Sequence, residues 1–185
     1  MNKLVIDTET SGLPPRGKTD ITDSLSWESC RIVQIAWAKY TPSGEFISKQ
    51  CYTIYPDGYN IPIVASNIHG ITTEKARAEG VDIVQAFTHL HSDLHDVDTI
   101  IAHNMKFDDS VIQSEMYRYN QNDLYLRWCN IKKECTMMMS SIPGRKWFKL
   151  SELYIYCFQK EPELVLHRAD ADVEICAAIY FHLKQ

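Results

Sequence analysis

Apolar residues along this chain gather in short runs that polar stretches separate. Residues 3–8 form an apolar run that ends in acidic and hydroxyl residues, which predicts a buried strand whose C-terminal end reaches an exposed edge. The polar stretch that follows, 9–29, contains Gly and Pro and predicts a long loop. Two runs rich in β-branched and aromatic residues, 31–40 and 45–55, flank a Pro-Ser-Gly turn at 42–44. These two runs predict a hairpin.

Beyond the hairpin, strand-like runs alternate with segments of helical spacing. Within residues 82–95 the apolar positions recur at helical spacing, at Ile83, Ala86, Phe87, Leu90 and Leu94. We also expect a short helix start at 72–75, strands at 99–103 and 131–136, and helices at 107–119, 150–158 and 168–183. This order predicts an α/β fold, with helices on the faces of a mixed sheet. Since no internal repeat or linker is visible, we expect one domain over residues 1–185.

The composition is that of an ordinary globular protein, because 45% of the 185 residues are hydrophobic and 23% are charged. A chain of this length buries about 70% of its extended surface, so its core needs neither a metal nor a disulfide. Apolar runs such as 100–102 are far shorter than the roughly 20 residues of a membrane helix. Residues 1–7 meet a charge after only three apolar residues, unlike a signal peptide. We therefore expect a soluble, cytoplasmic protein without a membrane partner.

The charge and the cysteines narrow the kinds of site that the chain can carry. A formal net charge of -5 argues against a protein that grips nucleic acid over a broad basic surface. It does not exclude a protein that touches phosphate through bound metal ions. The six cysteines are scattered, with no Cys-x-x-Cys pair and no Cys/His cluster at zinc spacing.

The first group of candidate residues is the acidic pair Asp7 and Glu9, at the end of the first predicted strand. Because side chains alternate along a strand, both carboxylates point to one face. Two carboxylates about 4 Å apart repel by roughly 1 to 4 kcal/mol, so the pair is costly unless a cation occupies it. The alternative is a pair of solvated acids at a strand end.

Two further groups also lie where predicted elements begin or end. Residues 103–108, His-Asn-Met-Lys-Phe-Asp, join the strand at 99–103 to the next helix, in a position where open α/β sheets bind ligands. His167 and Asp172 open the last helix, and their separation allows both to face a common cleft. Alternatively, Asp108 compensates the helix dipole and His167 is a capping-region histidine. Three such groups in this order are improbable by chance.

With these motifs the sequence resembles the DEDDh 3′-to-5′ exonucleases. This is the family of the epsilon proofreading subunit of bacterial DNA polymerase III, of ribonuclease T and of the three-prime repair exonucleases. The likeness lies in Asp7-Thr8-Glu9-Thr10-Ser11-Gly12, in the 103–108 motif, in His167-x-Ala169-x-x-Asp172 and in a smaller signature at 68–72. It spans nearly the whole chain.

The resemblance implies a ribonuclease H-like fold, with a five-stranded mixed sheet whose first strand is central. It implies that Asp7, Glu9, Asp108 and Asp172 are metal ligands and that His167 is the general base. Two Mg²⁺ or Mn²⁺ ions about 4 Å apart would clamp the scissile phosphate. Hard oxygen ligands suit these ions better than Zn²⁺.

The resemblance further implies how a nucleic acid binds. The turn at Thr10, Gly12 and Leu13 would hold the terminal nucleotide, Asn104 and Phe107 would position the strand, and His69 would line the cleft. The implied activity is hydrolysis at the 3′ end of single-stranded or frayed DNA, which releases nucleoside 5′-monophosphates in proofreading, replication or repair. A DNA polymerase is an expected partner, and the oligomeric state stays open. One alternative is an RNA exonuclease, like ribonuclease T or oligoribonuclease, and another is a catalytically silent module that binds nucleic acid or docks on a polymerase.

Two features depart from the family pattern. The loop at 13–30 is longer than in compact members, and Cys135-Thr136 stands where many members have Asp-Thr. Neither change removes an implied metal ligand. The long loop carries Arg16, Lys18 and Trp27, which could contact the 3′ strand; the alternative is a solvated loop.

Overall fold

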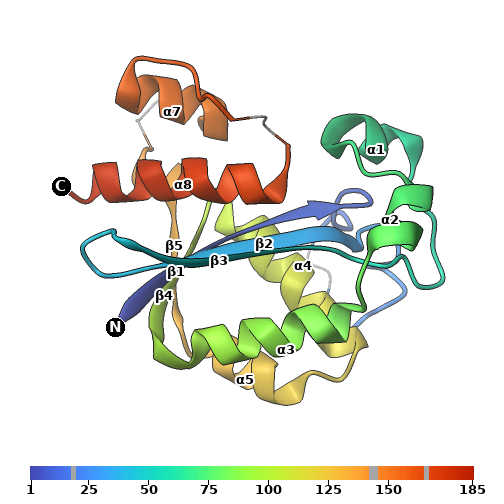
Figure 1. The fold of residues 1–185 in the computed structure, drawn as a ribbon. Coiled ribbons are helices and arrows are strands. Elements are labelled where there is room, and N and C mark those ends of the chain that lie inside the picture. The colour runs from blue at the N-terminus through green and yellow to red at the C-terminus, as the bar shows by residue number, and fades with distance from the viewer. Residues whose placement is uncertain (18–19, 142–145, 165–166) are drawn as a thin grey trace.

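A five-stranded mixed sheet forms the centre of the computed structural model, which describes residues 1–17, 20–141, 146–164 and 167–185 (Figure 1). The strands lie in the order β3-β2-β1-β4-β5. Their bounds are Asn2–Thr10 (β1), Ile32–Tyr40 (β2), Phe46–Thr53 (β3), Val97–Ala102 (β4) and Lys132–Cys135 (β5). β1 is antiparallel to β2 and parallel to β4, so the first strand is central, as the family resemblance implied.

The first strand is longer than its apolar run. The predicted loop begins at Glu9, but Glu9 lies opposite Gln34 and Thr10 lies opposite Ile32, so β1 continues to Thr10. Backbone pairing with β2 does not require apolar side chains, which is why the hydrophobic pattern missed this end of the strand. The hairpin of β2 and β3 is confirmed.

Eight α-helices and one 3₁₀ turn are seen in the described part of the chain. They are α1 (Ile63–His69), α2 (Thr73–Glu79), α3 (Ile83–Asp93), η1 (Leu94–Asp96), α4 (Met105–Arg118), α5 (Asn122–Cys129), α6 (Thr136–Met139), α7 (Leu150–Phe158) and α8 (Ala169–Leu183). The sequence pattern did not predict α1 and α5, because such short helices bury too few apolar residues to display a period. The predicted strand at 131–136 is one residue too long at each end, and α6 begins where β5 stops.

Helices cover both faces of the sheet. α8 packs on one face and α7 lies outside it, while α3 and α5 lie on the opposite side (Figure 1). Apolar side chains of α3, α4 and α5 share the larger core cluster with Leu4, Ile6 and Ile32. Ala36 and Ala38 of β2 meet α8 in a second cluster, where their small side chains permit a close approach of the helix.

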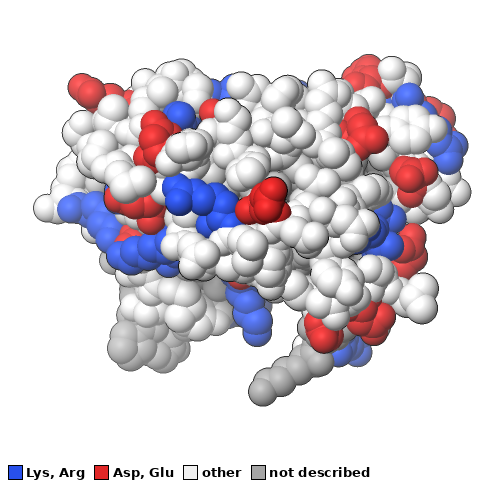
Figure 2. All heavy atoms as spheres, turned by 90° about the horizontal axis from the view of Figure 1, so that it is seen from below, with Lys and Arg blue, Asp and Glu red and all other residues white. Residues whose placement is uncertain are grey.

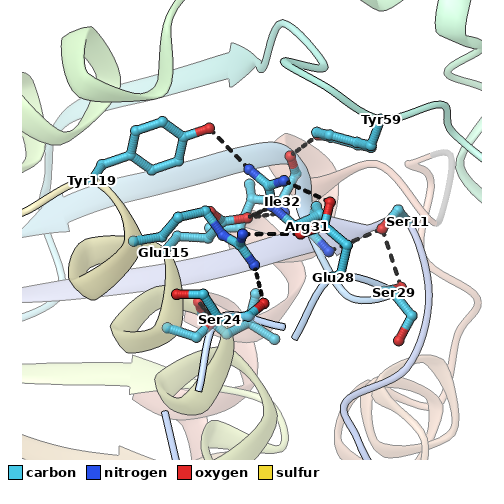
Figure 3. Close-up of polar contacts among 12 residues, drawn as sticks. Ser11, Ser24, Glu28, Ser29, Arg31, Ile32, Tyr59, Glu115 and Tyr119 are labelled. Atoms are coloured by element: carbon cyan, nitrogen blue, oxygen red, sulfur yellow. Dashed lines mark hydrogen bonds and ion pairs between the residues drawn. The ribbon is translucent and has the colours of Figure 1, made fainter. Parts of the chain in front are cut away.

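A buried ion-pair network ties the segment before β2 to α4 (Figure 3). The Arg31 Nε donates to Glu115 Oε1 at 2.7 Å, and both side chains are at least 95% buried. Arg118, one turn from Glu115, binds Glu28 at 2.9 Å and the main-chain carbonyl of Ser24 at 2.7 Å. The segment 24–31 is therefore anchored to a helix.

The same segment is joined to the turn after β1. Ser11 N–H donates to the Arg31 carbonyl, Arg31 N–H donates to Ser11 Oγ, and Ser11 Oγ donates to the Ser29 carbonyl (Figure 3). Trp27 is only 3% exposed and its indole N–H donates to the Asp20 carbonyl, so the alternative of a solvated loop is wrong at this residue. Lys18 lies outside the described residues.

The charges on the face seen in Figure 2 are mixed. Lys and Arg side chains form small groups, and Asp, Glu and uncharged residues separate them. On this face the described Lys and Arg side chains form no broad basic surface. Among the described helices, we find none with the length and apolar character that crossing a membrane requires.

Candidate active site

Four carboxylates from three elements come together beside the end of β1. Asp7 and Glu9 lie two apart on this strand and share a face. Asp108 lies in the first turn of α4, directly after β4, and Asp172 lies in the first turn of α8. The carboxyl of Asp7 is within electrostatic reach of the other three. The fold therefore brings together the acids that the motifs singled out.

Burial and mutual repulsion make these carboxyls hard to ionise. Burial raises the pKa of Asp7 well above its usual value, and repulsion by Asp108, Asp172 and Glu9 raises it further. Burial likewise raises the pKa of Glu9 to about 7, with added repulsion from Asp172 and Asp108. Because burial and repulsion disfavour the ionised carboxylates, a bound cation would stabilise them.

Asp108 is buried but firmly held. Burial raises its pKa to about 7, while hydrogen bonds from the hydroxyl and the main-chain N–H of Thr8 act in the opposite direction. Thr8 lies between Asp7 and Glu9 in β1, so one short stretch of strand supplies two acids and orients a third.

Asp172 and His167 are joined by the main chain. The His167 N–H donates to Asp172 Oδ2 at 3.2 Å, and His167 itself has a left-handed backbone, with φ of 62°. Burial raises the pKa of Asp172 to about 6, and His167 opposes this shift. Glu9, His167 and Asp172 each offer one possible ligand atom, and these three atoms lie within 4.8 Å of one another. The imidazole of His167 thus lies at the carboxylate cluster, on its exposed side.

The residues present fit a divalent cation. Asp172 Oδ1 is buried and has no hydrogen-bond partner among the described residues, so it is free to bind a cation. The oxygen-rich donor set, with mutually repelling carboxylates, favours a hard divalent ion. Asp7, Glu9, Asp108 and Asp172 are the residues that would hold it.

A hollow of about 440 Å³ adjoins the carboxylates. Residues 8–13 form one wall and α1 forms the other. Of the residues expected to bind nucleic acid, this hollow is lined by Thr10, Gly12, Leu13, His69 and Phe107. Asn104 lines a neighbouring hollow with Lys106, and Phe107 borders both. The structure therefore places all six beside the carboxylates.

The wall made by α1 was missed by sequence reasoning, apart from Ile68 and His69. Pro62, Val64 and Ala65 also line the hollow. The sequence offers one apolar pair at the i, i+4 spacing of a helix face, Val64 and Ile68, which is too short a pattern to predict a helix. Both remain exposed, at 71% and 56%, and so present an apolar surface to a ligand rather than to the core.

A scan of protein families matches residues 4–180 to the family described as RNase_T, Exonuclease. This chain belongs to that exonuclease family. The resemblance to an exonuclease family that the motifs indicated is thereby confirmed. A comparison with curated proteins gives no match.

Solved structures share the fold of this family member. Exonuclease I of E. coli in complex with a dA16 oligonucleotide aligns with a TM-score of 0.71 and 24% sequence identity. The zinc-bound E. coli complex with single-stranded DNA gives 0.73 and 23%, and exonuclease I of Methylocaldum szegediense gives 0.74 and 22%. Each alignment covers 99% of this chain and 40% of the other. The chain thus spans about two fifths of the length of these structures.

Proposed function

We propose that this chain removes nucleotides from the 3′ end of single-stranded or frayed DNA with the help of two divalent cations, Mg²⁺ or Mn²⁺. The observation that carries the proposal is the cluster of four repelling carboxylates beside a hollow of about 440 Å³. The complexes of exonuclease I with single-stranded oligonucleotides, and its zinc-bound form, support the substrate and the need for a metal. A polymerase partner, a proofreading or repair role and the single-domain organisation stay predictions.

In this proposal, the chain binds its cations through Asp7, Glu9, Asp108 and Asp172. When bound, such cations supply Lewis acidity to the phosphate and to the attacking water. The protein's own task is to keep the four carboxylates deprotonated and oriented. Two hydrogen bonds from Thr8 orient Asp108 and favour its ionised form. The hydrogen bond from His167 N–H does the same for Asp172.

His167 is the proposed general base. Its imidazole lies at the edge of the cluster and is exposed, so it can take the proton from water and pass it to solvent. General-base catalysis typically contributes 10²- to 10⁴-fold. His167→Ala should therefore lose about that factor in turnover at saturating metal, while metal binding and thermal stability stay close to those of the wild type.

The terminal nucleotide would occupy the hollow between the turn after β1 and α1. The exposed apolar side chains of Leu13, Val64 and Ile68 offer a surface on which a base can stack. The hydroxyl of Thr10 donates to the Gly12 carbonyl at 2.7 Å, which stiffens the turn that faces the ligand. A hollow that holds one terminal nucleotide, beside a cluster that holds the scissile phosphate through its cations, suits an enzyme that binds strand ends.

The test compares DNA and RNA oligomers of the same sequence, labelled at the 5′ end, in the presence of Mg²⁺ or Mn²⁺. We expect the DNA to shorten stepwise from its 3′ end and to release nucleoside 5′-monophosphates. Asp7→Ala should abolish hydrolysis yet still bind the oligomer. Asp98→Asn is the matched control, because this acid binds Lys3 at the other end of the sheet from the cluster.

The outcomes separate the alternatives. Faster hydrolysis of the RNA oligomer would make the chain an exoribonuclease. Binding without hydrolysis by the wild type, in either metal, would make it a silent nucleic-acid-binding module. Full activity of Asp7→Ala would show that the carboxylate cluster is not the reaction centre.

A further inference from the structure

Gln34 is the polar member of an otherwise apolar row on β2. Side chains alternate along a strand, so Gln34, Ala36, Ala38 and Tyr40 share a face. The other three pack with α8 in one apolar cluster. Gln34 is only 7% exposed, and a carboxamide buried in such surroundings costs free energy unless its polar atoms are paired.

The partner of Gln34 is the first N–H group of α8. Gln34 Oε1 accepts a hydrogen bond from Ala169 N–H at 3.0 Å. Ala169 is fully buried, so water cannot replace this acceptor. The side chain of the N-cap residue, Arg168, binds the carboxylate of Asp170 and caps none of the first N–H groups of α8. The first N–H groups of a helix have no partner within it, so Gln34 caps α8 from a neighbouring strand.

This hydrogen bond places the beginning of α8 relative to β1. Glu9 lies directly opposite Gln34 in the antiparallel pair of β1 and β2. In the chain, Ala169 lies between His167 and Asp172. The main-chain N–H of His167 donates to the carboxylate of Asp172. One buried side chain therefore fixes the segment that carries both His167 and Asp172 against the strand that carries Glu9.

We propose that Gln34 is a positioning residue, which holds His167 at the reaction centre through the main chain at Ala169. The inference rests on the proposed function, since it takes His167 as the general base. Without the acceptor, the buried Ala169 N–H is left unpaired, and the segment before α8 moves to recover a partner. His167 is exposed and has a left-handed backbone, so the packing of its own side chain does not hold it in place. A displacement of about 1 Å can cost 10²-fold in rate.

The test uses two substitutions with opposite expectations. Gln34→Met keeps the length of the side chain and removes the acceptor, and it should lower kcat by about 10- to 100-fold with little change in KM for the oligomer. Gln34→Glu keeps an acceptor oxygen and should recover most of the loss. Both are assayed at saturating Mg²⁺, so that a changed metal affinity does not enter. Gln34→Asn, with a shorter reach, replaces the methionine variant if that variant does not fold.

Tyr180→Phe is the matched control for the loss of a hydrogen bond on the same helix. Tyr180 donates to Glu134 Oε2 at 2.8 Å near the other end of α8. This variant should lower thermal stability without changing kcat. If it slowed turnover as much as Gln34→Met does, general loosening of α8 would explain both effects and the proposal would be wrong.

A double-mutant cycle tests the route through His167. If Gln34 acts by holding this residue, Gln34→Met should cost almost nothing further in a His167→Ala background. If the fold loss in kcat of the double variant equals the product of the two single losses, Gln34 does not act through His167. Wild-type turnover by Gln34→Met would also contradict the inference. An inactive wild type, or an undiminished His167→Ala variant, would instead contradict the proposed function.

Discussion

Thr8 donates twice to the same oxygen of Asp108, from its main-chain N–H at 3.0 Å and from its hydroxyl at 2.8 Å. One hundred residues separate the two in the chain, and β1 and α4 bring them together. Both bonds favour the ionised carboxylate and oppose the effect of burial on the pKa of Asp108.

Replacement of Thr8 by valine removes the hydroxyl and keeps the main-chain bond. The pKa of Asp108 should rise further, and metal binding requires the ionised form. We expect Thr8→Val to need more Mg²⁺ for half-maximal activity, by about tenfold for each 1.4 kcal/mol lost, yet to approach wild-type turnover at saturation. A Mg²⁺ titration of activity at fixed pH measures this. An unchanged midpoint would mean that the hydroxyl does not influence metal binding.

Thr99→Val is the matched control for this substitution. Its hydroxyl donates to Asp98 Oδ1 at 2.7 Å on β4, and Thr99 is buried like Thr8. The same chemical change is thus made on a parallel neighbour of β1, away from the carboxylate cluster. The Mg²⁺ midpoint of this variant should equal that of the wild type.

The carboxylate cluster should make the metal-free protein less stable as pH rises. A carboxyl with a higher pKa in the folded than in the unfolded chain stabilises the fold below the unfolded pKa, about 4. That contribution is lost as pH rises through the folded pKa, which is about 7 for Glu9 and Asp108. Each unit of pKa difference corresponds to about 1.4 kcal/mol, so each of these two carboxyls contributes a few kcal/mol to the loss. Mg²⁺ should reverse it.

Asp7→Asn isolates this effect in thermal melts with chelator. Burial lowers the pKa of His69 and of His103, which works in the opposite direction near neutral pH, but both histidines are present in the two proteins. We expect Asp7→Asn to be more stable than the wild type at about pH 8, with the difference shrinking toward pH 5. A difference that does not depend on pH would contradict the repulsion among the carboxylates.

The buried ion pair of Arg31 and Glu115 should be essential for stability. Glu115→Gln removes the buried charged partner of the Arg31 guanidinium and leaves it only the half-exposed Glu28, so we expect a loss of about 3 to 5 kcal/mol in the free energy of unfolding. Glu163→Gln is the control, because its pair with Lys160 is exposed and should change stability by less than about 1 kcal/mol. Denaturant unfolding measures both. Equal, small losses would show that the network in Figure 3 adds little.

Gly12 should be required for binding of the strand end. A Cβ at this position would lie 2.5 Å from the Ser29 carbonyl oxygen, so Gly12→Ala must push the turn after β1 away from the segment before β2. This turn lines the hollow proposed for the terminal nucleotide. We expect KM for the oligomer to rise by about tenfold, which corresponds to about 1.4 kcal/mol. A loss confined to kcat would assign the turn a different role.

The sequence alone predicted the features that depend on local spacing. Asp7 and Glu9 share a face because strand side chains alternate, and this holds whatever the rest of the chain does. The apolar period of 82–95 likewise predicted α3, within two residues at its C-terminal end. The family resemblance then implied the central place of β1, which the strand order confirms.

Tertiary structure decided the features that join distant parts of the chain. Gln34 looks like an ordinary polar residue of a half-buried strand, and only the packing of α8 shows that it accepts from Ala169, 135 residues away. In the same way, only the packed structure shows that Thr8 binds Asp108. It also shows that α1 lines the hollow, although the apolar pattern of α1 is too short to predict a helix. Local periodicity records which side of an element is buried. It does not record which element covers that side, so the partners of buried polar groups emerge only when the elements pack.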